Sequence, residues 1–295
     1  MNKPKNWLDV ENANLKQFVG GLLQTELIPS FVQTTKYGTI SINRFGMRDQ
    51  DYEALPAPGT HRTAVLGASA IMGWGVGDGE TFEALIEGRM NEEWSGGAFA
   101  RYELLNMAVP GYRPPQLLGM ADKAFEFKPD VLFYFAAGRE VTRCTAGVAA
   151  LIAKGVDIPY EGLRDIVAKA GVTEGLDEVQ IRQRLTPYGP ELLAYVYRRI
   201  VEQSRARGIR PVWIFLPQVR EGSWQEETPE TVAIAESAGF LLINLDDVYE
   251  GRKVDEVRLA PWDDHPNALG HRLIAERLFA AIEARRGEIF QSARH

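Results

Sequence analysis

Ser69 is the side chain of this sequence that is best placed for nucleophilic chemistry. It stands in the segment VLGASAIMGWGV, residues 65–76, where an apolar run breaks into Gly-Ala-Ser and then into spaced glycines. Such a run predicts a strand that delivers the serine to the open edge of a sheet. Three roles are then open to Ser69: a nucleophile, a member of a phosphate-binding loop, or only a turn residue.

The spacing of the glycines excludes the two common phosphate-binding loops. A P-loop requires Gly-x4-Gly-Lys-Ser/Thr, but Met72 stands where the second glycine should follow Gly67, and no lysine follows before residue 81. A dinucleotide loop requires Gly-x-Gly-x-x-Gly, and Asp78 or Glu80 occupies its last glycine position. We therefore expect no cofactor.

A nucleophilic serine needs a general base, and the chain has four histidines. His61 comes before the first expected strand, at the wrong edge of the sheet, and His295 is the last residue. His271 falls inside the last expected helix, and we interpret it as structural. His265 remains. In WDDHPNALGH it precedes a proline that should open that helix, which would fix the backbone holding a base.

Two aspartates directly before His265 are candidates for fixing its tautomer. In an extended approach to the helix, neighbouring side chains point to opposite sides, so only one aspartate can face the imidazole. We expect Asp263 to do so, and Asp264 to point toward solvent or the helix N-terminus. No metal site is expected, because the sequence has no His-x3-His pair, no cysteine pair and no third ligand near His265.

The elements that must position these residues alternate along the chain. Short apolar runs without two-residue alternation are typical of parallel strands covered on both faces. The expected strands are residues 63–67, 103–107, 131–136, 212–216 and 240–245, and the expected helices are residues 81–91, 115–125, 190–207, 229–238 (capped by Thr228) and 266–284. This order predicts a three-layer α/β/α sandwich with a mostly parallel five-stranded sheet, and places Ser69 at the ligand-binding edge.

Two segments lie outside this alternation. We expect residues 1–60 to form an N-terminal appendage that packs on the core, with an amphipathic helix followed by a strand at residues 39–43. Residues 61–295 would form the α/β/α domain. Within it, residues 142–189 carry several helical patterns, and this insertion predicts either a lid or a helical cap without substrate contact.

Composition narrows the class of protein further. The net charge of −7 over 295 residues argues against a nucleic-acid partner. The single cysteine, Cys144, excludes an internal disulfide, fits a reducing compartment and is interpreted as a buried apolar residue. The longest apolar stretch near the N-terminus, residues 18–23, is too short for a signal peptide or a membrane span, so a cytoplasmic location is expected. Nothing in the sequence indicates an oligomeric state.

Four blocks in order, over roughly residues 38–285, resemble the motifs of the SGNH/GDSL hydrolase superfamily, in particular a branch associated with envelope polysaccharides. They are INRFGMRDQDY followed by HRTAVLGASAIMGWGVGDGETFEALIEGRMN, then LLNMAVPGYRPPQ, PDVLFYFAAGREV and DDHPNALGHRLIAERL. The resemblance implies a flavodoxin-like fold and ester hydrolysis or acyl transfer through a serine acyl-enzyme. It also implies Ser69 as nucleophile, His265 as base, and the backbone N–H groups of Ser69 and Gly111 as oxyanion donors.

Four positions depart from the family pattern. Ala68 replaces the aspartate of Gly-Asp-Ser, and Trp262 stands where an aspartate often precedes the histidine. The oxyanion asparagine falls on Arg139, and the aspartate after it falls on Glu140. Loss of one oxyanion donor typically costs roughly 3–4 kcal/mol of transition-state stabilisation. Arg139 would replace that donor, bind an anionic substrate group, or only pair with Glu140 or another surface acid.

The sequence thus predicts a serine esterase or O-acyl (acetyl) transferase that acts on small acyl esters, with glycan esters among its expected substrates. Trp74, Arg139 and Glu140 form the expected substrate-binding set. The alternative is a catalytically degenerate relative that keeps the pocket as a carbohydrate- or partner-binding module. Ala68 and Arg139 favour that alternative, whereas Ser69, Gly111 and DDHPN favour the enzyme.

Overall fold

A parallel five-stranded sheet forms the centre of the computed structural model, which describes residues 15–223 and 229–290. Its strands, in spatial order, are β6 (Arg101–Asn106), β5 (Thr60–Leu66), β7 (Val131–Ala136), β8 (Arg210–Phe215) and β9 (Leu241–Asn244). Every neighbouring pair is parallel. The five expected strands are confirmed, and β7 is buried along its whole length because helices cover both of its faces.

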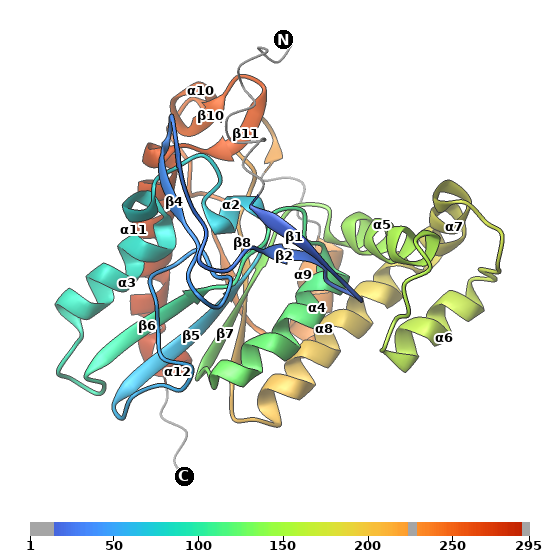
Figure 1. The fold of residues 1–295 in the computed structure, drawn as a ribbon, viewed down its shortest axis with the longest axis horizontal. Helices are drawn as coiled ribbons and strands as arrows, with labels where there is room; N and C mark the ends of the chain where they lie inside the picture. The colour runs from blue at the N-terminus through green and yellow to red at the C-terminus, as the bar shows by residue number, and fades with distance from the viewer. Residues whose placement is uncertain (1–14, 224–228, 291–295) are drawn as a thin grey trace.

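Helices cover the sheet on both sides, as Figure 1 shows. The helices α3 (Phe82–Glu93) and α11 (Ala268–Ala284) pack against each other on one face, and α4 (Pro114–Ala124), α8 (Gly189–Arg205) and α9 (Pro229–Ala238) cover the other. The three-layer α/β/α architecture is therefore confirmed. The helix expected from residue 266 begins two residues later, and the Thr228 cap expected for α9 lies outside the described residues.

The order of the strands places a ligand site at a defined point of the sheet. The chain leaves β5 to form β6 on one side and then returns to form β7 on the other side of β5. Ligands in open α/β sheets bind beyond the carboxyl ends of the strands where the strand order reverses in this way. The segments that follow β5 and β7 therefore flank the natural position for a site.

Two β-hairpins precede the sheet: β1 (Lys16–Gly20) with β2 (Gln24–Leu27), and β3 (Val32–Thr35) with β4 (Gly38–Ser41). The amphipathic helix expected here is wrong for residues 15–60, and residues 1–14 lie outside the described residues. Gly20 and Gly21 explain the difference, because both have positive φ, 72° and 53°, and glycine pairs of this kind favour tight hairpin turns. The strand expected at residues 39–43 corresponds to β4. Leu15, Leu27, Ile40, Ile42 and Met47 of this segment join the main hydrophobic core.

A helical segment separates β7 from α8. It contains α5 (Glu140–Ala153), α6 (Glu161–Lys169), α7 (Glu178–Leu185) and the short 3-10 helix η3 (Thr186–Tyr188). Helix α5 packs on α4, α7 and α8, whereas α6 and α7 extend away from α2 (Ser69–Met72) in Figure 1. The expected helical character of residues 142–189 is confirmed; a function as a lid stays a prediction. Cys144, on α5, is buried as expected.

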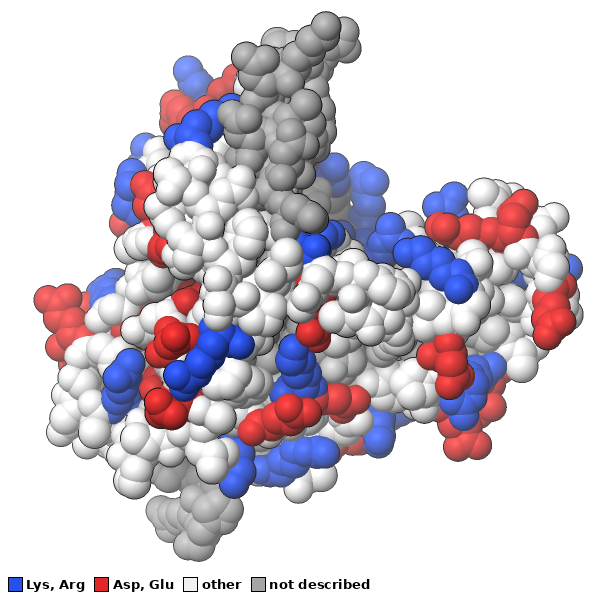
Figure 2. All heavy atoms as spheres, viewed as in Figure 1, with Lys and Arg blue, Asp and Glu red and all other residues white. Residues whose placement is uncertain are grey.

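The remaining elements are short. They are η1 (Asp78–Glu80), η2 (Phe125–Phe127), α10 (Val254–Val257), α12 (Arg286–Ile289) and a small antiparallel pair, β10 (Arg258–Ala260) with β11 (Asp263–Pro266). On the face in Figure 2, basic and acidic side chains are interspersed. Within residues 15–223 and 229–290, none of the helices combines the length and apolar character needed to cross a membrane.

Candidate active site

Ser69, His265 and Asp263 form a continuous chain of hydrogen-bonding groups. His265 Nε2 lies 2.6 Å from Ser69 Oγ, and His265 Nδ1 lies 2.5 Å from Asp263 Oδ1. Asp263 is only 5% exposed, so its carboxylate faces the imidazole in surroundings largely free of water. The structure thus brings together the three residues that the sequence analysis assigned as nucleophile, base and acid, although Ser69 and His265 are 196 positions apart.

Ser69 is the first residue of α2, a single helical turn that starts just beyond β5. The N–H groups of Ile71 and Met72 both donate to the Ala68 carbonyl, at 3.1 and 3.0 Å. Ala68 makes no side-chain cap, because alanine has no side-chain hydrogen-bonding group. Gly67 is needed here, because a Cβ on it would overlap the Ile71 side chain.

Polar side chains outside this turn hold α2 in place. Arg48, buried, donates through Nη1 to the Met72 carbonyl at 3.1 Å. Asn106, at the end of β6, donates through Nδ2 to the Ile71 carbonyl at 3.2 Å, and its backbone N–H donates to Asp49 Oδ2 at 3.0 Å. Burial lowers the pKa of Arg48 to about 10, so the guanidinium stays charged at neutral pH.

His265 and Asp263 are two residues apart on β11, and side chains two apart on a strand face the same side. The expected choice of Asp263 over Asp264 therefore agrees with this geometry. Asp264 Oδ2 lies 3.9 Å from an Arg220 guanidinium nitrogen, with 42% of its side chain exposed. Pro266 ends the strand rather than opening the helix, which corrects the sequence analysis.

Asn267 is the residue that opens α11. Its Oδ1 accepts a hydrogen bond from the Gly270 N–H at 3.0 Å. Asparagine is among the preferred N-cap residues because its side-chain oxygen satisfies a helix N–H that has no intrahelical acceptor. Inside the helix, His271 is fully buried and its Nδ1 accepts from the Phe82 N–H at 3.2 Å, in keeping with a structural role. Burial lowers the pKa of His271 to about 3.

A small cavity of about 100 Å³ opens beside Ser69. Most of its wall is apolar, formed from the ends of β7 and β8 and from α2 and α4, and includes Ile71, Leu117, Phe135, Leu216 and Pro217. Its polar or charged lining residues are Ser69, Arg143, Gln218, Tyr249, Asp264 and His265. A cavity of this size and character suits a short acyl group.

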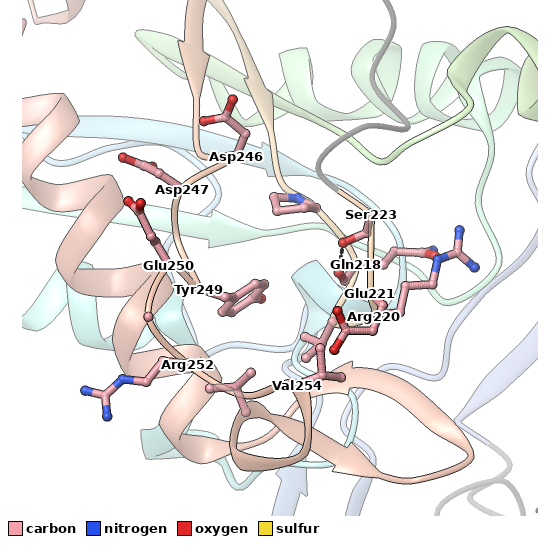
Figure 3. Close-up of a pocket in the computed structure, with 14 residues that line it drawn as sticks. Gln218, Arg220, Glu221, Ser223, Asp246, Asp247, Tyr249, Glu250, Arg252 and Val254 are labelled. Carbon is pink, nitrogen blue, oxygen red and sulfur yellow. Dashed lines mark hydrogen bonds between the residues drawn. The ribbon is translucent and has the colours of Figure 1, made fainter.

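A second cavity, of about 460 Å³, shares part of its wall with the first. Pro217, Gln218 and Tyr249 line both. Figure 3 shows Tyr249 between Asp246, Asp247 and Glu250 on one side and Gln218, Glu221 and Ser223 on the other. The Tyr249 hydroxyl is buried and, among the described residues, has no hydrogen-bond partner. This larger cavity is rich in groups that can bind hydroxyls.

Two other expected site residues lie at the same sheet edge. The Trp74 ring is 6.0 Å from the His265 ring, measured between centres. Gly111 follows β6 and has a φ of 88°. Its loop lies beside the turn that carries Ser69, because the Val109 N–H donates to the Gly67 carbonyl at 3.2 Å. Gly111 is exposed and does not line the cavity beside Ser69.

Arg139 and Glu140 are placed differently from expectation. Arg139 is exposed, has a left-handed φ of 65° at the start of α5, and lines neither cavity. Glu140 is 1% exposed, and its Oε2 accepts hydrogen bonds from the hydroxyls of Tyr134 at 2.7 Å and Tyr197 at 3.2 Å. Burial raises the pKa of the Glu140 carboxyl. Glu140 is therefore not placed to bind substrate, because its carboxylate is enclosed by other side chains.

Sequence reasoning missed Arg143, Gln218 and Tyr249. Gln218 and Tyr249 follow the carboxyl ends of β8 and β9, and that position alone could have marked them as candidates. Arg143 lies one helical turn after Arg139, but the motif register drew attention to the earlier arginine. A single sequence does not show which residue of the first turn of α5 faces the edge of the sheet.

Three carboxylates line a separate cavity of about 510 Å³: buried Glu83 and Glu87, and partly buried Asp49. Burial is the main cause that raises the pKa of each, and their mutual proximity adds to the effect for Asp49 and Glu83. Tyr52 donates to Glu87 Oε2 at 2.7 Å. Across the part of the chain that the structure describes, no group of three or more His, Cys, Asp or Glu side chains is arranged to hold a metal ion.

Comparisons with known proteins connect the chain to solved structures only. No protein-family model matches the sequence, and no curated protein matches it either. The psychrotrophic esterase EstA from Pseudoalteromonas sp. is 14% identical, with 77% of this chain and 99% of EstA covered and a TM-score of 0.48. A lipolytic protein from Desulfitobacterium hafniense DCB-2, described as of G-D-S-L family, is 15% identical, with 74% and 98% covered and a TM-score of 0.46. The acetylxylan esterase Axe2 from Geobacillus stearothermophilus is 12% identical, with 75% and 94% covered and a TM-score of 0.47.

Proposed function

We propose that the protein is a serine ester hydrolase of the SGNH/GDSL type. The observation that carries this proposal is the chain of contacts from Asp263 through His265 to Ser69, at 2.5 and 2.6 Å. A serine hydroxyl is a weak nucleophile unless an adjacent base removes its proton. A third group that orients the base completes the arrangement used for acyl transfer.

In the proposed reaction, Ser69 Oγ attacks the carbonyl carbon of a bound ester while His265 Nε2 takes the serine proton. Asp263 accepts the hydrogen bond from Nδ1–H and stabilises the imidazolium that forms. The imidazolium then protonates the departing alcohol, which leaves an acyl group on Ser69. Water, or the hydroxyl of an acceptor, then attacks the acyl carbon and gives its proton to His265. The bond between the acyl group and Ser69 Oγ breaks, and His265 returns the proton to Ser69.

The two adjoining cavities favour a substrate that is an ester of a short acyl group with a larger, polar alcohol. The cavity of about 100 Å³ beside Ser69 is mostly apolar and would hold an acetyl group. The neighbouring cavity of about 460 Å³ carries carboxylates, Gln218 and the Tyr249 hydroxyl. Such groups bind the hydroxyls of saccharides, so we propose acetylated saccharides as the substrate class.

Hydrolysis of p-nitrophenyl esters with increasing acyl length tests the proposal. We expect turnover of the acetyl ester and a steep fall for longer chains, because overfilling a packed cavity costs about 1–3 kcal/mol. Ser69→Ala should abolish turnover, whereas the exposed serine variant Ser95→Ala should keep it. Turnover that survives in Ser69→Ala would overturn the assignment of Ser69 as nucleophile. Absence of turnover from the folded wild-type protein would favour a binding module instead.

A further inference from the structure

Arg143 is a basic side chain that lines the same small cavity as Ser69 and His265. It stands on the first turns of α5, directly after the strand that ends at the reversal of the sheet order. Its side chain is 28% exposed, so part of the guanidinium is enclosed and part remains accessible. Neither the sequence motifs nor the proposed mechanism assigns it a role.

A buried polar network fixes this guanidinium. Arg143 Nη2 donates to the Tyr112 carbonyl at 2.9 Å, and Nε lies 3.4 Å from Glu140 Oε1. The other Glu140 oxygen is held by Tyr134 and Tyr197, as described above. Tyr197 in turn accepts a hydrogen bond from Trp213 Nε1 at 2.9 Å. The side chains that hold Arg143 are thus themselves enclosed in the core.

The network leaves two nitrogens of the guanidinium without a hydrogen-bond acceptor. Within residues 15–223 and 229–290, Arg143 Nη2 donates to its carbonyl, whereas Nη1 forms no hydrogen bond and Nε faces Glu140 without forming one. Arginine carries five N–H donors in a rigid plane and stays protonated at all ordinary pH values. A fixed cation with unused donors in a mainly apolar cavity is suited to a negative charge that appears only during reaction.

We propose that Arg143 is a catalytic residue that donates to the oxyanion formed when Ser69 attacks the ester. In the SGNH/GDSL family an asparagine supplies this oxyanion donor, and Arg139 stands at the corresponding position of this sequence. Arg143, on the next turn of α5, would supply the donor instead. The inference rests on the proposed function, since an oxyanion forms only if Ser69 is acylated. Glu140 is a positioning residue in this account, because it acts on the substrate only through Arg143.

The size of the cavity favours the oxyanion over an anionic substituent of the substrate. A volume of about 100 Å³ leaves little room for a second charged group once a short acyl chain is bound. An oxyanion needs no extra space, because it is the ester carbonyl oxygen itself.

Steady-state kinetics with p-nitrophenyl acetate, a neutral substrate, test the proposal. Arg143→Ala should lower kcat on the order of 10²-fold, the usual effect of removing one oxyanion donor, and leave KM nearly unchanged. Arg143→Lys should keep part of the activity. Millimolar guanidinium should partly restore kcat in Arg143→Ala and should not raise it in Arg182→Ala, a control on the exposed surface of α7.

Arg143→Ala leaves Glu140 buried without its cation, which could prevent folding. The double variant Glu140→Gln/Arg143→Ala removes that charge and serves as the second test, and thermal unfolding shows which variants are folded. An unchanged kcat in a folded Arg143 variant would overturn the proposal. A higher KM for anionic esters with unchanged kcat in the Arg143 variant would overturn it too. A lower kcat in Arg139→Ala instead of Arg143→Ala would do the same.

Failure of this inference is distinguishable from failure of the proposed function. If the folded wild-type protein neither hydrolyses p-nitrophenyl acetate nor reacts with a fluorophosphonate probe, the proposed function fails and Arg143 has no oxyanion to bind. In the other case the wild-type protein is active, and Arg143→Ala is equally active and does not respond to guanidinium. Only the assignment of Arg143 then fails.

Discussion

Asp263 contacts His265 at two points through a single oxygen. Oδ1 accepts the His265 backbone N–H at 3.0 Å and lies 2.5 Å from the imidazole Nδ1. The backbone contact fixes the carboxylate relative to the strand, and the ring contact then fixes the imidazole relative to the carboxylate. Nε2 is thereby directed at Ser69, so the orientation of the imidazole depends on this one aspartate.

Removing Asp263 should therefore cost far more activity than removing Asp264. We expect Asp263→Ala to lower kcat by roughly 10³–10⁴-fold, the range typical of losing the acid of a serine triad. Asp264→Ala is the matched control, since that carboxylate lies 3.9 Å from Arg220. Steady-state kinetics on both folded variants decide the matter. The reverse order would overturn the assignment, and two silent substitutions would mean a dyad of Ser69 and His265 alone.

Arg139 should limit stability through its backbone conformation. It holds a φ of 65°, a left-handed conformation that costs most L-residues roughly 1–2 kcal/mol and that asparagine adopts more readily. Arg139→Asn should raise the free energy of unfolding by about 0.5–1 kcal/mol for this reason. Urea denaturation measures the change. The same replacement at Arg182, inside α7, should have the opposite sign because asparagine is a poorer helix former. A loss of stability in Arg139→Asn would count against this explanation.

The buried carboxylates should make the stability of the fold fall as pH rises. Burial raises the pKa of Glu83 in the folded state. In the unfolded chain a glutamate has a pKa of about 4.3 and releases its proton above that pH, whereas the folded protein still binds it. The resulting stabilisation is full below that value and is lost as pH rises through the folded pKa.

Glu83→Gln should remove this contribution, and its stability relative to wild type should increase as pH rises from acid to neutral. The expected change has one direction, in favour of the variant at the higher pH, because only the wild-type protein loses the protonated carboxyl. Denaturation across that pH range checks it, with Glu92→Gln on the exposed side of α3 as the control. A stability difference that does not vary with pH would show that Glu83 is ionised in the folded protein.

Tyr249 should help select the alcohol part of the substrate. Its hydroxyl is buried beside both cavities without a partner among the described residues. Tyr249→Phe should leave the fold as stable or slightly more so, since an unsatisfied buried hydroxyl is removed. It should also raise KM for an acetylated saccharide more than KM for p-nitrophenyl acetate. Equal effects on the two substrates would mean that the larger cavity does not bind the alcohol.

Much of this organisation could be predicted from the sequence because it depends on local pattern. Apolar runs and their spacing located all five strands of the sheet, and the i, i+2 relationship of Asp263 and His265 followed from an extended chain. The strands β1, β2 and β3 were not predicted, because apolar residues around Gly20 and Gly21 also fit a helical period. The position of the Arg143 side chain depends on how α5 is rotated about its axis against the sheet. Tertiary packing sets this rotation, so the local sequence does not predict it.

The most direct measurement of the central claim is reaction of the folded protein with a fluorophosphonate probe, followed by mapping of the modified peptide. The probe forms a bond only with a serine whose hydroxyl is activated by a base. We predict a single modification on Ser69, absent from Ser69→Ala and much slower in Asp263→Ala. An unmodified Ser69 in folded protein, or modification of another serine, would contradict it.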